Sequence, residues 1–104
     1  MNIEKRDVNI FLTLWIKHDR ELWSELRDIQ IRLLVDRIIK EMTFQEMADL
    51  HKVPVGRMRQ LFEAILVKID RCISPEVAKH LRLLNQKLDQ RGDKPFTTVD
   101  IYLN

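Results

Sequence analysis

The most constraining feature of the chain is the segment 43–69, in which two helix starts follow one another closely. Thr43 and Glu46 have the spacing of a capping box, in which each side chain accepts a hydrogen bond from the backbone amide of the other residue. Pro54 disfavours the α conformation in the residue before it, and it suits the first turn of a new helix. The segment therefore predicts two helices joined by a short turn. The expected helices are 44–51 and 55–71.

The apolar residues of this segment recur at three- and four-residue steps, which is typical of helices with one buried face. In the first helix the inward residues are Phe44, Met47 and Ala48, and Leu50 is a further candidate. Two helices joined by so short a turn form a helix-turn-helix. The inward residues of the second helix are expected to be Met58, Leu61, Phe62, Ile65, Leu66 and Ile69.

The same segment carries a recognisable series of residue types. A capped start is followed by glutamate and alanine, then by a Val-x-Val-Gly-Arg-x-Arg-Gln run, and then by an end similar to Leu-x-Lys-Leu. The segment thereby resembles region four of bacterial sigma factors, the promoter-binding domain at their C-terminal end. The match is close over 43–69 and looser over 28–71. The residues that carry it are Thr43, Glu46, Ala48, Val53, Val55, Gly56, Arg57, Arg59, Gln60, Leu66, Lys68 and Ile69.

The resemblance implies how the second helix would meet DNA, because in a helix-turn-helix that helix lies in the major groove. Arg59 and Gln60 fall on base-reading positions of the family; arginine can pair with guanine and glutamine with adenine. Val55 and Gly56 occupy two earlier base-reading positions, so part of the family's readout is missing or replaced by apolar contact with thymine methyl groups. Without the resemblance, all of these would be ordinary solvated residues. The candidate phosphate contacts are Arg57, Lys52 and Lys68.

Length and composition agree with one small all-α domain. The chain has 104 residues, of which 45% are hydrophobic and 33% charged, and it has 2 glycines and 3 prolines. No apolar run is long enough for a membrane span, and the start lacks the apolar core of a signal peptide. The single cysteine, Cys72, cannot form an internal disulfide, which favours a reducing, cytoplasmic compartment.

Net charge alone does not argue for nucleic acid, because it is only +2. Its distribution is more informative. The segment 51–72 carries five lysines and arginines against two acidic residues, whereas 28–50 carries three against five. The positive excess therefore lies on the expected recognition helix.

The residues before the motif predict further helices. The segment 7–17 is amphipathic, with Val8, Phe11, Leu12, Trp15 and Ile16 on one face. Either the helix breaks at His18, with Asp19 capping a second helix, or a heptad-like seam continues to Leu33 as a coiled coil. In the first alternative Trp15 and Trp23 are core anchors. The apolar segment 27–41 is expected to be a helix buried on two sides, which supports the helix-turn-helix.

After the motif, Ser74, Pro75 and Glu76 mark another helix start. The stripe of Val77, Leu81, Leu84 and Leu88 along this helix would either fold back onto the N-terminal helix or form a homodimer contact. Gly92 is expected to end the helix, and the tail 96–103 would be a short strand or an ordered arm.

The chain offers little for catalysis. His18, His51 and His80 lie on three different segments without metal-ligand spacing, and no glycine-rich phosphate loop is present. Cys72 is flanked by both an arginine and an aspartate, which does not favour an activated thiol. We therefore expect neither an enzyme nor a bound cofactor.

The sequence thus predicts a single domain over 1–104, an all-α bundle with a helix-turn-helix core at 28–71. A helical arm at 7–27 and a C-terminal helix and tail at 74–104 are added to this core. The implied function is that of a bacterial DNA-binding regulator or sigma-like accessory protein, since the chain is too short for a complete sigma factor. The alternative is an interaction module that binds RNA polymerase or an anti-sigma protein but not DNA.

Overall fold

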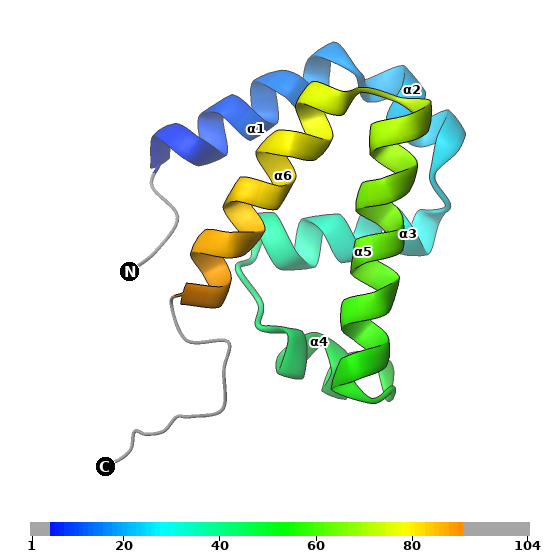
Figure 1. The fold of residues 1–104 in the computed structure, drawn as a ribbon, viewed down its shortest axis with the longest axis vertical. Helices are drawn as coiled ribbons and strands as arrows, with labels where there is room; N and C mark the ends of the chain where they lie inside the picture. Colours follow the sequence, from blue (N-terminus) through cyan, green and yellow to red (C-terminus); the bar gives the residue numbers. More distant parts are fainter. Residues whose placement is uncertain (1–4, 91–104) are drawn as a thin grey trace.

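The computed structural model describes residues 5–90, and within them every regular element is helical, as the sequence predicts (Figure 1). The expected stop at Gly92 and the tail 96–103 lie outside the described residues. None of the described helices combines the length and the apolar character that a membrane crossing requires. The elements are α1 (Lys5–Lys17), α2 (Asp19–Glu25), α3 (Asp28–Leu34), the π-helical turn η1 (Val35–Ile39), α4 (Phe44–His51), α5 (Val55–Cys72) and α6 (Pro75–Leu88).

The two central helices, α4 and α5, form within a residue of the expected bounds. The capping box is present: the Glu46 amide donates to Thr43 Oγ1 over 3.0 Å, and the Thr43 amide donates to Glu46 Oε1 over 2.8 Å. Most of the expected inward residues are buried, but Leu61 is half-buried and Leu50 is 59% exposed. The expectation that Leu50 faces the core is therefore wrong, because α4 buries only the face that contacts α5 and η1.

Removing the cap of α4 should cost about 1 kcal/mol. Thr43→Ala leaves the Glu46 amide without its side-chain acceptor, and replacing such a cap by alanine costs about 0.5–2 kcal/mol. The free energy of unfolding from urea denaturation would measure this loss. Gln45→Ala is the matched control, since Gln45 is exposed in the same turn and should change stability by less than about 0.5 kcal/mol. Equal losses in the two variants would contradict the capping role.

The N-terminal helices break where one of the two alternatives places the break. α1 ends at Lys17, and His18 leaves the helical conformation with φ −112° and ψ 18° before α2 begins at Asp19. A single continuous helix is thereby excluded. The expectation that Asp19 caps α2 is wrong, because Asp19 is already its first helical residue and His18 is the N-cap. Trp15 is half-buried and donates its indole N–H to Asp19 over 3.0 Å. Trp23, however, is 52% exposed, so its expected role as a core anchor is wrong.

The buried face of α1 is rotated relative to the expectation. Phe11 is buried as expected, but Leu14 is buried with it, and Leu12 and Ile16 are exposed. The reason is the position of α6, against which α1 packs (Figure 1). Asp7 is also buried on this side, where its carboxylate accepts a hydrogen bond from Lys87 over 2.7 Å.

α3 and η1 together form the helix expected at 27–41, and they bury residues on more than one side. The winding changes from α to π at Val35. Among the apolar residues of this segment, Ile29 and Ile39 are exposed. The loop to α4 contains Glu41 with φ 54°, a conformation that favours glycine. The buried apolar residues of α3 and η1 are Ile31, Leu33, Leu34 and Ile38.

α6 begins as predicted and completes the core. Ser74 accepts from the Val77 amide over 3.3 Å, and Pro75 is the first helical residue. The whole apolar stripe of α6 is buried against α1 and α5, with Leu81 only 1% exposed. Folding back within the chain is thus the correct alternative. The stripe cannot form a homodimer contact, because its own chain already covers it.

Candidate nucleic-acid interface

The turn between α4 and α5 is short and tightly defined. Lys52 ends α4 in the left-handed conformation, with φ 59° and ψ 46°. The Val53 amide closes the turn by donating to the Ala48 carbonyl over 3.0 Å. Pro54 then precedes α5 in an extended conformation, and its carbonyl accepts from the Met58 amide over 3.0 Å. These bonds determine the angle at which α5 leaves the turn.

The turn brings most of the predicted site residues to one end of α5. Lys52, Gly56, Arg57 and Gln60 are exposed there, whereas Val55 is half-buried against the core. Lys68 is half-buried, and at 1.5 Å per residue it lies roughly 12 Å further along the helix than Gln60. It does not belong to the cluster at the start of α5.

The side chains of α5 divide into an outward face and two flanks. Successive residues are rotated by about 100°, so Gly56 and Gln60 each lie about 160° from the buried Met58, in opposite senses. They form the outward face. Arg57 lies on one flank, about 100° from Met58, and Arg59 lies on the other flank. Lys68 falls on the same flank as Arg57. The predicted base readers therefore do not share one face.

Gly56 is a further distinctive feature of the start of α5. It is exposed, and a methyl group added at its Cα would meet nothing within 4 Å. The fold therefore does not require glycine at this helical position. In the same turn α5 has no acidic residue, and its N-cap, Pro54, has no side chain that could accept a hydrogen bond. The first backbone amides of α5 are available to an acceptor from outside the helix.

Arg59 is held between helices rather than projecting from an open surface. Its Nη1 lies 3.7 Å from the Asp89 carboxylate at the end of α6, and its Cζ lies 4.7 Å from the centre of the Phe44 ring. Its side chain is 42% exposed. Truncating Arg59 would thus remove contacts within the fold as well as any contact with DNA.

Sequence reasoning missed the residues that hold this region together. Arg37 is completely buried, and its guanidinium donates to the Asn85 side chain, the Met42 carbonyl and the Asp89 carboxylate, each over 2.9 Å. Its Cζ lies 4.0 Å from the centre of the Phe44 ring. No local signal distinguishes Arg37, because Asp28, Arg32, Asp36 and Lys40 are charged residues of the same segment. Two of its partners, Asn85 and Asp89, could not be identified because they lie 48 and 52 residues further along the chain, at the end of α6.

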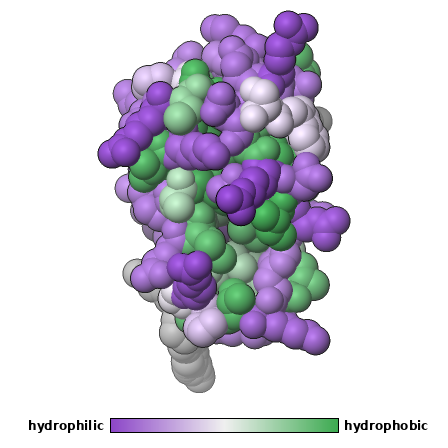
Figure 2. Space-filling view, turned by 90° about the vertical axis from the view of Figure 1, so that its right-hand side faces the viewer, coloured by the Kyte–Doolittle hydropathy of each residue, from purple (hydrophilic) through white to green (hydrophobic). Residues whose placement is uncertain are grey.

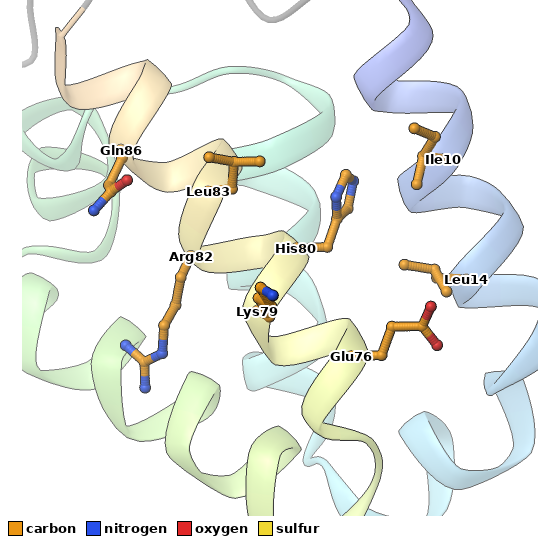
Figure 3. Close-up of a pocket in the computed structure, with 8 residues that line it drawn as sticks. All are labelled: Ile10, Leu14, Glu76, Lys79, His80, Arg82, Leu83 and Gln86. Carbon is orange, nitrogen blue, oxygen red and sulfur yellow. The ribbon is translucent and has the colours of Figure 1, made fainter.

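A shallow groove lies on another part of the molecule, between α1 and α6 (Figure 3). It has a volume of about 500 Å³. His80 points from α6 toward α1, between the apolar Ile10 and Leu14, and its Nε2 lies 3.2 Å from the Asp7 carbonyl oxygen. None of the predicted site residues lines this groove.

The residues considered for catalysis remain apart. His18 lies between α1 and α2, His51 ends α4, and His80 is in α6. Cys72 is exposed at the end of α5. Among residues 5–90, as far as the structure describes them, no group of three or more His, Cys, Asp or Glu side chains could hold a metal ion. Comparisons of the chain with protein-family models, with curated proteins and with solved structures found no match.

Proposed function

We propose that the chain is a DNA-binding transcription regulator or sigma-like accessory protein that docks the start of α5 in the major groove. The proposal rests on the sequence resemblance to sigma region four and on the arrangement at the start of α5. There, an outward face of Gly56 and Gln60 lies between a flank with Arg57 and a flank with Arg59. In a major groove such a helix directs its outward face to base edges and its flanks to the phosphates of the groove walls.

The observation that carries the proposal concerns two nearby positions, 52 and 56. At each of them the residue present makes the folded chain less stable than another residue type would. Lys52 adopts a left-handed conformation, in which glycine would avoid a steric cost of about 1 kcal/mol. Gly56 is in a helix with open space around it, where alanine would be better by about 1 kcal/mol. A fold selected for stability alone would exchange these residue types. Local preferences overridden in this way are typical of functional sites.

Both exceptions suit a polyanionic partner. Lys52 supplies a cation beside the start of α5, and cations that neutralise phosphates contribute much of the affinity for DNA. Gly56 lets the backbone approach a base pair without an intervening side chain. The first amides of α5 add donors at the positive end of the helix dipole, which favours phosphate there.

Replacing Lys52 by glycine should make the chain more stable and less able to bind DNA. Lys52→Gly relieves the left-handed strain, which should raise the free energy of unfolding by about 1 kcal/mol. It also removes one phosphate contact, so affinity for any duplex should fall several-fold and the salt slope should decrease by about 0.9. Urea denaturation and fluorescence anisotropy with a labelled duplex would measure the two effects.

Lys52→Gln is the matched control, because it removes the charge and keeps the side chain in the left-handed conformation. It should lose the same affinity without the gain in stability. If Lys52→Gly binds duplex DNA as tightly as the wild type does at every salt concentration, Lys52 does not belong to a DNA interface.

The second candidate is an interaction module that binds RNA polymerase or an anti-sigma protein and does not bind DNA. It is favoured by exposed apolar side chains outside the start of α5, among them Trp23, Ile29 and Leu50. On the side of the molecule where α5 lies, hydrophobic patches alternate with hydrophilic side chains (Figure 2). A chain without measurable duplex binding but with affinity for polymerase would support this candidate.

A further inference from the structure

The end of α6 is tied to the centre of the fold by a buried charge. Arg37 is completely buried, and a buried guanidinium requires an opposite charge and full hydrogen bonding. Asp89 supplies the charge at 2.9 Å, and Asn85, one turn earlier on α6, accepts from Nε. The position of the Asp89 carboxylate is therefore determined by the core and not by solvent.

The same carboxylate oxygen stands beside Arg59. Asp89 Oδ1 lies 2.9 Å from Arg37 Nη2 and 3.7 Å from Arg59 Nη1. The Arg59 guanidinium also packs on the ring of Phe44, the first residue of α4, and Phe44 is 2% exposed. An ion pair and an aromatic face together restrict the rotamers of a side chain that is still 42% exposed.

This arrangement sets Arg59 apart from the outward face of α5. Gly56 and Gln60 point about 160° away from Met58, but Arg59 is rotated by only about 100°, toward α6. If the outward face meets base edges, a guanidinium on this flank meets the wall of the groove. Phosphate oxygens line that wall, and a planar guanidinium suits them well.

We propose that Arg59 contacts a backbone phosphate rather than a base, and that Asp89 is the positioning residue that holds it there. This inference rests on the proposed DNA-binding function and reassigns one residue within it. Base readout then falls to Gln60 and to the backbone at Gly56. The C-terminal helix is part of the DNA-binding unit, because its last turn orients a contact made from α5.

The test compares Arg59→Gln with Gln60→Ala on two duplexes, one selected from a random pool and one with the same composition in scrambled order. Arg59→Gln should weaken both duplexes by the same factor, about 3- to 10-fold, and lower the salt slope by about 0.9. Gln60→Ala should weaken mainly the selected duplex and leave the slope unchanged. A loss in Arg59→Gln that is confined to the selected duplex, and to one base pair within it, would overturn the proposal.

The role of Asp89 is tested by a double-mutant cycle. The loss of its negative charge acts on the duplex in every background and cancels in the cycle. The change in duplex affinity caused by Asp89→Asn is therefore measured twice, once with Arg59 present and once in the Arg59→Gln background. With Arg59 present, this change should be less favourable by a factor of at least about three. Additive effects would show that Asp89 does not position Arg59. Asp89→Asn also removes the charged partner of Arg37 and could lower stability. Each affinity is therefore calculated for the folded fraction of the chain, which circular dichroism measures.

Failure of the DNA function is distinguishable from failure of this inference. If the wild type binds neither duplex, the proposed function is wrong, and a titration of the 15N-labelled chain with pyrophosphate then tests the phosphate site alone. A shift of the Arg59 Nε–Hε resonance in the wild type that is reduced in Asp89→Asn supports a phosphate site positioned by Asp89. An Arg59 resonance that does not move overturns it.

Discussion

Arg37→Ala should lower the free energy of unfolding by about 3–5 kcal/mol, the range found when one partner of a buried ion pair is removed. The variant leaves the Met42 carbonyl and the Asn85 side chain without their donor, and it leaves a cavity between η1 and α6. The Asp89 carboxylate also loses a charged partner at 2.9 Å. Urea denaturation followed by circular dichroism measures the loss directly.

Two controls separate the buried network from ordinary surface pairing. Arg82 pairs with Glu63 at 2.8 Å, but the two side chains are 43% and 55% exposed, so Arg82→Ala should cost less than about 1 kcal/mol. Arg37→Met fills most of the volume without a buried charge and should lose less stability than Arg37→Ala. If Arg37→Ala is as mild as Arg82→Ala, the network does not stabilise the fold.

Gly56→Glu should abolish most duplex binding while the fold stays intact. A Cβ atom at position 56 would meet no other atom within 4 Å, so the fold has room for a side chain there. An acidic residue in the first turn of a helix is also favourable for stability. In a DNA complex the same carboxylate would lie against phosphates and base edges. Like charges placed opposite one another across an interface cost several kcal/mol, so affinity should fall by more than about tenfold. Fluorescence anisotropy and urea denaturation on the same samples measure both properties.

Gly56→Ala is the matched control for the helical backbone. It should raise the free energy of unfolding by up to about 1 kcal/mol and weaken duplex binding less than Gly56→Glu does. Wild-type affinity in Gly56→Glu would exclude the start of α5 from the interface. A loss of stability in Gly56→Ala would instead mean that the fold needs this glycine.

The parts of the fold that local rules govern could be predicted from the sequence. The Thr43 capping box, the break before Pro54 and the Ser74 helix start each depend on residues within a few positions of one another. The periodicity of α5 and α6 was sufficient to identify their buried faces, since each helix has a single well-separated apolar stripe. These features determined the all-α class and most of the helix bounds.

The rest depended on contacts that are distant in sequence. Arg37 reaches partners 48 and 52 residues away, and no local pattern indicates that a charged residue will be buried there. α1 has apolar residues around much of its circumference, so the choice of Leu14 rather than Leu12 or Ile16 was made by packing against α6. The surroundings of Arg59 likewise depend on the end of α6, which lies outside the helix-turn-helix segment 43–69 that contains Arg59.

The most direct test of the central claim is binding of the wild-type chain to labelled duplex DNA across a salt series, after selection of bound sequences from a random pool. With Lys52, Arg57 and Arg59 as phosphate contacts, the logarithm of the association constant should fall with the logarithm of salt concentration with a slope of roughly −3. The selected sequence should bind at least about 1,000-fold more tightly than scrambled duplex. If the chain binds no duplex at low salt, even at millimolar protein concentration, the proposed DNA-binding function is wrong and the interaction module is favoured.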